Sequence, residues 1–395
     1  MKTQRLILCL FAFAAVFCSA AGADEVREAE KAELARQEAF RSGFEKIVND
    51  MNKGSFDSFV KATDKHDMVD RIFGLRLIDQ KIKKQFNEKL EYSYDDVITS
   101  AFAVPENGLK ATVLGIESRG NRGRAVIRFD EPKFNFRYHE YDLRLDNKSR
   151  VVVVDWTDFL NGMRFSESIG RSMVMAAPSA TNMRKLLDFQ NVKDSELFMF
   201  GELLKAARDR RLDRYLEVRD GLQERFQRQR IVIESSVQLA RQVRKRRQMI
   251  AALKIMAEHF PDEPLYSLML LDYYFPSGMY QEAFQALQRL ADRLDVEDAA
   301  MEARLSAAAL VMGNAQDAAA YADRAIGLES GLELGWWSAL NARAATSDYA
   351  GSVEALQKLE GDFGHALGPE ALQKNPAYAQ LLQSTEYKAW RETVK

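Results

Sequence analysis

The stretch that decides the fold is GNAQDAAAYADRAIGLES, residues Gly313–Ser330. Its alanines are ordered rather than scattered, because Ala318, Ala322 and Ala325 stand four and three residues apart. On an α-helix, that spacing places all three side chains on one face. A helix with a stripe of small residues can approach a neighbour closely, since the distance between two helix axes depends on the side chains at their contact. The stretch therefore predicts one half of a tightly packed helical hairpin.

The same pattern occurs in the segments on either side. Three segments that begin at Pro264, Ala299 and Glu333 align, and their starts are 35 and 34 residues apart. Each contains a break residue and, five positions later, a small residue: Gly278 and Ala283, Gly313 and Ala318, Ser347 and Ser352. A fixed period of this length indicates stacked repeats, whereas a generic alanine-rich bundle, the alternative, has no reason to keep it.

These segments resemble the tetratricopeptide repeat, a helix–turn–helix unit of 34 residues. The resemblance is carried by GMYQEA at residues 278–283, which matches the family's turn into its second helix, and by Trp336 early in a first helix. Leu340 departs from the pattern, because it stands near a position that the family keeps small. The resemblance implies an all-α solenoid over residues 180–395, with its clearest repeats at 264–298, 299–332 and 333–366 and a closing helix at 369–395.

The resemblance also implies a function. Proteins of this family mostly bind peptides or protein segments in the concave groove of the solenoid. By register with the family, the first-helix residues that would face this groove include Asp272, Arg304, Trp337 and Asn341. The alternative for these four residues is ordinary packing or solvation.

The period of the apolar residues changes upstream of the repeats. Residues 110–118, 124–130, 134–145 and 150–160 are rich in β-branched and aromatic side chains with partial alternation, which predicts strands. Short turn sequences such as RGNRG and DNKS join them, so an antiparallel meander of four strands is expected. Apolar residues at helical spacing between residues 56 and 103 predict two or three helices that cover one face of this sheet.

We therefore predict an α+β chain in which N-terminal helices pack on a four-stranded antiparallel sheet, followed by the tetratricopeptide-like solenoid. A charged, exposed helix over residues 24–54 leads into a domain over 55–178, and Ala176-Ala177-Pro178 marks its end. The order of helices and then a curved sheet is similar to that of the nuclear-transport-factor-two-like α+β cone. That resemblance rests on element order alone.

The first 23 residues predict export. A basic start with Lys2 and Arg5 is followed by an apolar run and by Ala21-Gly22-Ala23, which together are typical of a secretory signal peptide cleaved near Ala23. The apolar run, about 12 residues, is shorter than the roughly 20 residues that a membrane anchor needs. A lipid anchor at Cys18 is a further alternative, although Phe17 stands where that signal requires a small residue.

Cysteine usage points to a compartment. Cys9 and Cys18 are the only cysteines, and cleavage of the signal peptide would remove both. An exported protein of this size without disulfides fits a bacterial periplasm better than a eukaryotic secretory route.

Candidate chemistry in the sequence is sparse. The four histidines have no partner at metal-ligand spacing, and neither a phosphate-binding loop nor a nucleophile elbow is present. In HEYD, residues 139–142, alternation places His139 on one face of a strand and its acidic neighbours on the other, which predicts an exposed sheet face. We expect no metal and no cofactor.

Asp155 is the candidate for a small-ligand pocket. Alternation places it on one strand face with Val151, Val153 and Phe159, with Asp158 nearby. In an apolar cavity this carboxyl would have a raised pKa and serve in acid/base chemistry. The alternative is a strand-end residue that is bonded to neighbouring backbone or to an arginine.

One segment, residues 203–247, is strongly basic. It holds fourteen Lys and Arg against six Asp and Glu, whereas the whole chain has a net charge of −2. These arginines either pair with acids three or four residues away on exposed helices or dock an anionic partner such as lipid headgroups. Nucleic acid is not expected behind a signal peptide.

The sequence thus favours an exported, non-enzymatic scaffold of the bacterial cell envelope that binds a protein or peptide through its repeats. The alternative is a small-ligand-binding protein or acid/base enzyme that uses a pocket of the N-terminal domain.

Overall fold

The computed structural model describes residues 20–74, 80–100, 102, 110–176, 183–184 and 192–393. Most of the predicted signal peptide, both cysteines and the predicted domain boundary at Pro178 lie outside these residues. None of the described helices is both long and apolar enough to cross a bilayer.

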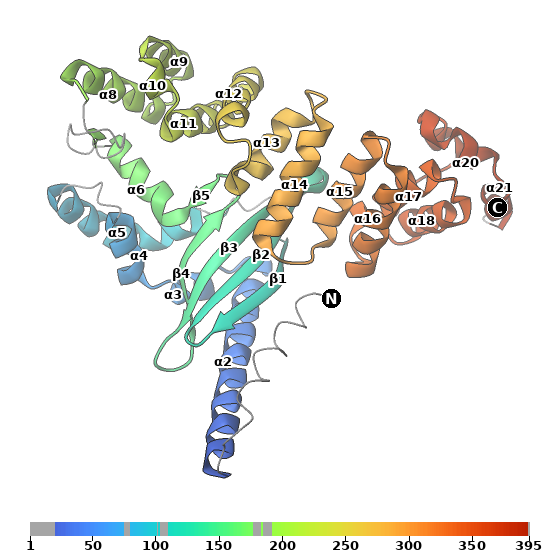
Figure 1. Ribbon diagram of the computed structural model, residues 1–395, viewed down its shortest axis with the longest axis horizontal. Coiled ribbons are helices and arrows are strands. Elements are labelled where there is room, and N and C mark those ends of the chain that lie inside the picture. The colour runs from blue at the N-terminus through green and yellow to red at the C-terminus, as the bar shows by residue number, and fades with distance from the viewer. Residues whose placement is uncertain are drawn as a thin grey trace.

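An antiparallel sheet stands at the centre of the molecule (Figure 1). Its strands follow one another in sequence order: β1 (Lys110–Arg119), β2 (Arg122–Glu131), β3 (Asn135–Leu145), β4 (Val151–Asp158) and β5 (Met163–Arg164). The four predicted strands are confirmed. The two-residue β5 is an addition that the sequence did not reveal, because a strand this short carries no alternation.

Helices from the N-terminal part cover one face of the sheet. They are α2 (Ala20–Asn52), α3 (Asp57–Ala62), α4 (Lys65–Gly74) and α5 (Gln80–Ser100), with α6 (Phe165–Ala176) following the sheet. Phe40 and Phe44 of α2 are fully buried in a core that includes Ile127 and Trp156 of the sheet. The second half of α2 is therefore part of this core rather than only an exposed lead-in, while its first half extends away from the body (Figure 1).

The opposite face of the sheet is covered by the C-terminal helices. Tyr138 and Phe159 share a buried cluster with Leu270 and Leu287 of the helical array. In Figure 1, α13 (Ser267–Tyr274) and α14 (Tyr280–Leu294) lie across the sheet. The resemblance to the cone fold remains a prediction; both faces of this sheet pack against helices.

The remaining helices form paired, antiparallel hairpins that lead away on both sides of α13 and α14 (Figure 1). On one side are α8 (Asp194–Arg208), α9 (Leu212–Gly221), α10 (Glu224–Gln227), α11 (Arg230–Gln242) and α12 (Arg246–His259). On the other side are α15 (Ala299–Val311), α16 (Ala315–Leu328), α17 (Glu333–Ala345) and α18 (Tyr349–Gly361). This part of the chain has the tetratricopeptide-like helical fold that the sequence predicted.

The repeat extends further upstream than the sequence showed. In every hairpin, a residue with positive φ stands two positions before the second helix: Arg210, Arg244, Gly278, Gly313 and Ser347. These positions are spaced by 34, 34, 35 and 34 residues. The left-handed conformation suits glycine, so arginine at the first two turns concealed the repeat from sequence reading. Five hairpins therefore share one period.

The predicted closing helix is instead a set of short elements: α19 (Pro369–Leu372), α20 (Ala379–Gln383) and α21 (Thr385–Thr393). Pro376, which begins the intervening 3-10 turn, interrupts the helical run. Leu372, Leu381 and Trp390 are buried against α17 and α18, so this segment covers the last apolar face of the array.

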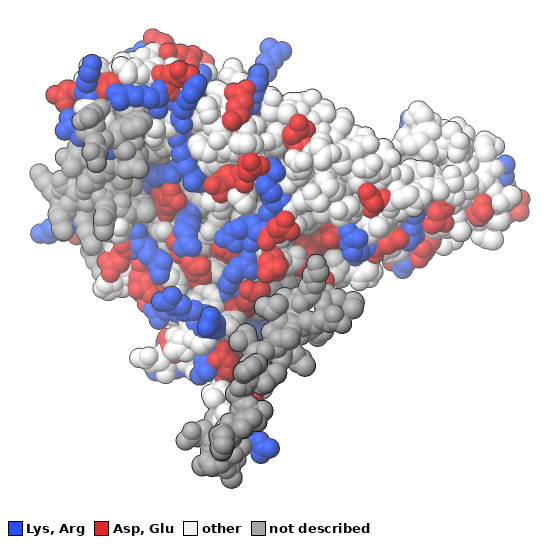
Figure 2. All heavy atoms as spheres, in the orientation of Figure 1, with Lys and Arg blue, Asp and Glu red and all other residues white. Residues whose placement is uncertain are grey.

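Charged side chains are unevenly distributed on the face shown in Figure 2. They gather over the sheet and over the first hairpins, while much of the array from α13 to α18 shows few of them. Partners that recognise charge would therefore meet this face mainly where the sheet and the first hairpins lie.

The alanine stripe supports a direct test of the packing. Ala322 is fully buried, whereas Ala320 on the same helix is exposed. Ala322→Leu overfills the contact between helices and should lower the free energy of unfolding by about 1–3 kcal/mol. Ala320→Leu should change it by less than about 0.5 kcal/mol. Urea denaturation of both variants measures the difference, and equal effects would contradict close packing along the stripe.

Candidate functional site

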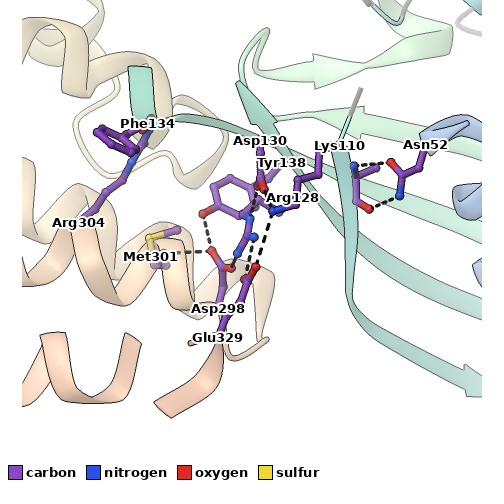
Figure 3. A network of polar contacts seen from close by, with 11 residues as sticks. Asn52, Lys110, Arg128, Asp130, Phe134, Tyr138, Asp298, Met301, Arg304 and Glu329 are labelled. Carbon is purple, nitrogen blue, oxygen red and sulfur yellow. Dashed lines mark hydrogen bonds and ion pairs between the residues drawn. The ribbon is translucent and has the colours of Figure 1, made fainter. Parts of the chain in front are cut away.

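A buried arginine joins the sheet to the helical array. Arg128 of β2 is fully buried, and its guanidinium contacts three carboxylates: Asp130 at 2.6 Å, Asp298 at 2.5 Å and Glu329 at 2.8 Å (Figure 3). Asp130 belongs to the sheet, whereas Asp298 and Glu329 belong to the array. Burial lowers the pKa of Arg128, but the three carboxylates outweigh it and raise the pKa above its ordinary value. The positive charge of Arg128 is thus neutralised by carboxylates from both the sheet and the helical array.

Asp298 has a second role in the same network. One of its oxygens accepts hydrogen bonds from the Tyr138 hydroxyl, at 2.6 Å, and from the backbone N–H of Met301, at 3.0 Å. Asp298 is therefore the N-cap of α15, and Figure 3 shows it between the sheet and the start of that helix. The start of α15 is fixed by the same carboxylate that holds Arg128.

A second ionic contact lies beside the first. Both oxygens of Glu140 lie 2.6 Å from the guanidinium of Arg293 on α14, and Arg124 also donates to Glu140. Arg124 reaches further and donates to the backbone carbonyl of Leu294 at 2.6 Å. The sheet and the array are therefore joined by two neighbouring sets of charge-assisted hydrogen bonds, which are stronger than neutral ones.

Removing the central arginine should destabilise the molecule strongly. Arg128→Met leaves the buried Asp298 without its counter-charge, while Asp130 keeps its pair with Lys110 at 2.9 Å. Breaking a buried ion pair in this way costs about 3–5 kcal/mol. The control is Arg324→Met, which removes a partly exposed pair with Glu302 and should cost less than about 1 kcal/mol. Urea midpoints of the two variants compare these costs. Similar midpoints would show that the network does not hold the two parts together.

The Glu140 contact predicts a pH dependence. Burial raises the pKa of Glu140, but hydrogen bonds from Arg293 and Arg124 outweigh this effect and hold the pKa below its ordinary value. The stabilisation is therefore complete above the unfolded-state pKa and is lost as the pH falls through the lower folded-state pKa. In the wild type, the free energy of unfolding should fall more steeply below about pH 4.5 than in Glu140→Gln. Chemical denaturation at several pH values checks this, and parallel curves would contradict it.

A groove runs along this junction. It has a volume of about 460 Å³ and lies between the turn that joins β2 to β3 and the first helices α13 and α15. Its floor is apolar and its rim is charged. The floor residues include Phe136, Leu268, Leu271 and Phe275, and the rim includes Glu131, Arg246, Asp272 and Arg304. We call this the junction groove.

Two of the four residues that the repeat register predicted for partner binding line the junction groove. They are Asp272 and Arg304. Arg304 also makes a long hydrogen bond of 3.4 Å to the carbonyl of Phe134 in the β2–β3 turn. That any of the four residues binds a partner stays a prediction.

The other two lie elsewhere. Trp337 donates to Glu333 and packs its ring against His365, and Asn341 accepts a hydrogen bond from the Tyr378 hydroxyl. Asn341 therefore contacts the covering segment, whereas Trp337 contacts its own helix and the loop that follows α18, and neither lines the junction groove.

A second hollow continues from the junction groove. It has a volume of about 340 Å³ and shares Arg246 and Asp272 with it. Its other lining residues come from the end of α11, the turn to α12 and α12 itself, and include Arg241, Arg244 and Lys245. We call this second hollow the annex. Because it adjoins the junction groove, the basic residues at the α11–α12 turn lie next to the apolar floor.

The structure divides the basic segment into two groups. Several of its arginines pair within the chain: Arg214 with Glu217, Arg228 with Glu224, Arg230 with Glu234. These agree with the predicted pairing along exposed helices. By contrast, the exposed side chains of residues 244–247 make no hydrogen bond or ion pair with any part of the chain that the structure describes.

The predicted surroundings of Asp155 were wrong. The pairing of β3 with β4 shifts after Asp142, so that Asp142 faces Asp155 while Leu143 faces Val153. This bulge turns Asp155 away from the face that carries Val151 and Val153. Sequence alternation cannot reveal a bulge, because it assumes that every residue changes face.

Asp155 is instead held by hydrogen bonds at the strand end. It accepts from the backbone N–H groups of Trp156 and Ser166 and from the Ser166 hydroxyl, the last at 2.6 Å. Burial raises its pKa, and these hydrogen bonds counteract part of the effect. The bonded strand-end alternative therefore describes this residue better than a free acid in an apolar pocket.

The prediction of an exposed face at His139 was also wrong. His139 is fully buried with its ring 4.8 Å from that of Phe129, and Glu140 on the opposite face is only 6% exposed. Both are buried because helices cover both faces of the sheet. Burial lowers the pKa of His139 despite the nearby carboxylate of Asp158. Over the described residues, no group of His, Cys, Asp or Glu is arranged to hold a metal ion.

A smaller cavity of about 240 Å³ lies between α6 and α11. Its charged residues, Arg171 and Glu234, pair with each other, and Glu234 also binds Arg230 and the Tyr266 hydroxyl. The other polar lining groups are mainly serine hydroxyls and glutamine amides. Because its charged side chains are already paired with each other, this cavity offers a ligand fewer unpaired charged groups than the junction groove does.

Comparisons with known proteins add little. No protein-family model matches the sequence, and no curated protein sequence matches it. Among solved structures, a chain titled "MamA MSR-1 C2" is 13% identical over 42% of this chain and 95% of its own length, with a TM-score of 0.31. That likeness is slight and shows nothing of the function.

Proposed function

We propose that this protein is an exported, non-enzymatic scaffold of the bacterial cell envelope that binds a segment of a protein partner in the junction groove. The groove is the observation that carries the proposal. It joins an apolar floor to a charged rim, a combination found where proteins bind peptides or small ligands. Its walls come from elements that the Arg128 network holds in place, so it exists before a partner arrives, which lowers the entropic cost of binding.

The acidic side chains favour a binding function over catalysis, because each already has a partner within the chain. The groove's acids are engaged with arginines: Asp272 lies 3.7 Å from Arg241, and Glu131 lies 3.7 Å from Arg137. Asp155, the candidate for acid/base chemistry, accepts three hydrogen bonds at a strand end. A catalytic acid and base instead need to converge on one reacting position.

Export rests on the signal-like first 23 residues. A periplasmic location would bring the junction groove into contact with envelope proteins. The mass of the purified protein's N-terminal peptide tests this, because cleavage near Ala23 should leave a chain that begins at Asp24.

Site-specific cross-linking tests the proposed binding. A photoreactive amino acid at Ala307, which is exposed in the groove, should form a cross-link to a discrete partner in living cells. The same amino acid at Ala320, exposed on α16 outside the groove, should form none. The groove variant Phe275→Asp should abolish the cross-link from position 307. Equal cross-linking from both positions, or none from 307, would refute groove binding.

A further inference from the structure

The charge around the groove is not balanced within the chain. The groove and its annex are lined by five cations, Arg241, Arg244, Lys245, Arg246 and Arg304, but by only two acids, Glu131 and Asp272. The exposed cations at 244–246 form no ion pair with the rest of the described chain, whereas most of the segment's other arginines do. Apart from those around the first turn, including Arg210 and Arg211, the unpaired cations of the segment therefore gather at the α11–α12 turn, beside the groove.

Two further arginines are incompletely bonded. Arg241 donates to the carbonyl of Leu160, and its buried Nη2 atom lies 3.7 Å from a carboxylate oxygen of Asp272, too far for a hydrogen bond. Arg304 has only the long bond to Phe134 and a ring contact with Phe136. Burial lowers the pKa of both arginines. An approaching carboxylate would supply the hydrogen bonds that these guanidiniums lack, and such charge-assisted bonds are strong.

We infer that the occupant of the junction groove is an acidic, extended segment of a protein partner, whose apolar side chains lie on the floor between Leu268 and Phe275 and whose carboxylates face Arg304, Arg246 and the α11–α12 turn. This inference rests on the proposed function and specifies the chemistry of the partner. A membrane surface fits less well, because the apolar floor lies inside a hollow that a flat array of headgroups does not enter.

The repeat supplies a matched pair of variants. Arg210 and Arg211 occupy the same positions in the first hairpin's turn as Arg244 and Lys245 do in the second, and all four are exposed. Arg210 and Arg244 have φ values of 54° and 56°, a conformation that glycine adopts without strain. Replacing either arginine with glycine therefore removes a charge without harming the turn. The double variants Arg244→Gly/Lys245→Gln and Arg210→Gly/Arg211→Gln differ only in their distance from the groove.

The probe is a fluorescein-labelled twelve-residue peptide with three Asp-Leu pairs separated by Gly-Ser, compared with the same peptide carrying Asn in place of Asp. Fluorescence anisotropy with the full chain measures both affinities. The Asp peptide should bind at least about tenfold more tightly than the Asn peptide. Arg244→Gly/Lys245→Gln should weaken Asp-peptide binding by about tenfold, and Arg210→Gly/Arg211→Gln by less than about twofold. Added salt should weaken binding of the Asp peptide.

Three results would overturn the inference. One is equal binding of the Asp and Asn peptides, and another is equal loss in the two double variants. The third is binding to phosphatidylglycerol vesicles that depends on Arg244 and Lys245 while the Asp peptide does not bind, which would indicate a membrane partner. If the cross-link from position 307 persists in Arg244→Gly/Lys245→Gln and the Asp peptide does not bind, the acidic partner is wrong although groove binding stands. If the cross-link itself is absent, the proposed function fails.

Discussion

The buried guanidinium of Arg128 is the interaction on which the rest of the structure depends. A charge removed from water is tolerated only when partners surround it, and here two of its three carboxylate partners belong to the helical array. The sheet therefore cannot bury Arg128 without the array. The same contact fixes the start of α15 through Asp298, and α15 with α13 forms one wall of the junction groove. The stability of the junction and the shape of the candidate site thus have one physical origin.

The second constraint is the period of the hairpins. The recurring left-handed turn and the small residues at helix contacts allow five hairpins to stack with nearly the same spacing. Stacking of this kind leaves one row of first helices facing inward. In this molecule the sheet occupies part of that inner side, so the available groove is bounded by a strand turn as well as by helices. The binding surface is therefore a property of both parts together rather than of the repeats alone.

Local patterns predicted the elements well, because strand alternation and the alanine stripe are set by near neighbours in sequence. The four strands and the last three hairpins were found in this way. The first two hairpins were not resolved as repeats, since Arg210 and Arg244 replace the expected glycine. Contacts between distant segments were beyond such patterns: the docking of the array on the sheet buried His139, and a bulge changed the face of Asp155. For the candidate site, the register placed Asp272 and Arg304 at the groove. It also chose Asn341, which bonds Tyr378 of the C-terminal segment, and Trp337, which packs against His365 in the loop after α18. The groove's second wall, in the sheet, had no local signal at all.

We expect the sheet and the array to form one rigid unit, because the Arg128 and Glu140 contacts join them. Double electron–electron resonance measures this directly, with spin labels at Arg119 on the sheet and Ala320 on the array, both exposed, after Cys9 and Cys18 are replaced by serine. A fixed junction predicts a single narrow distance distribution for the otherwise wild-type chain. A broad or two-peaked distribution would show that the two parts move independently and would contradict the account.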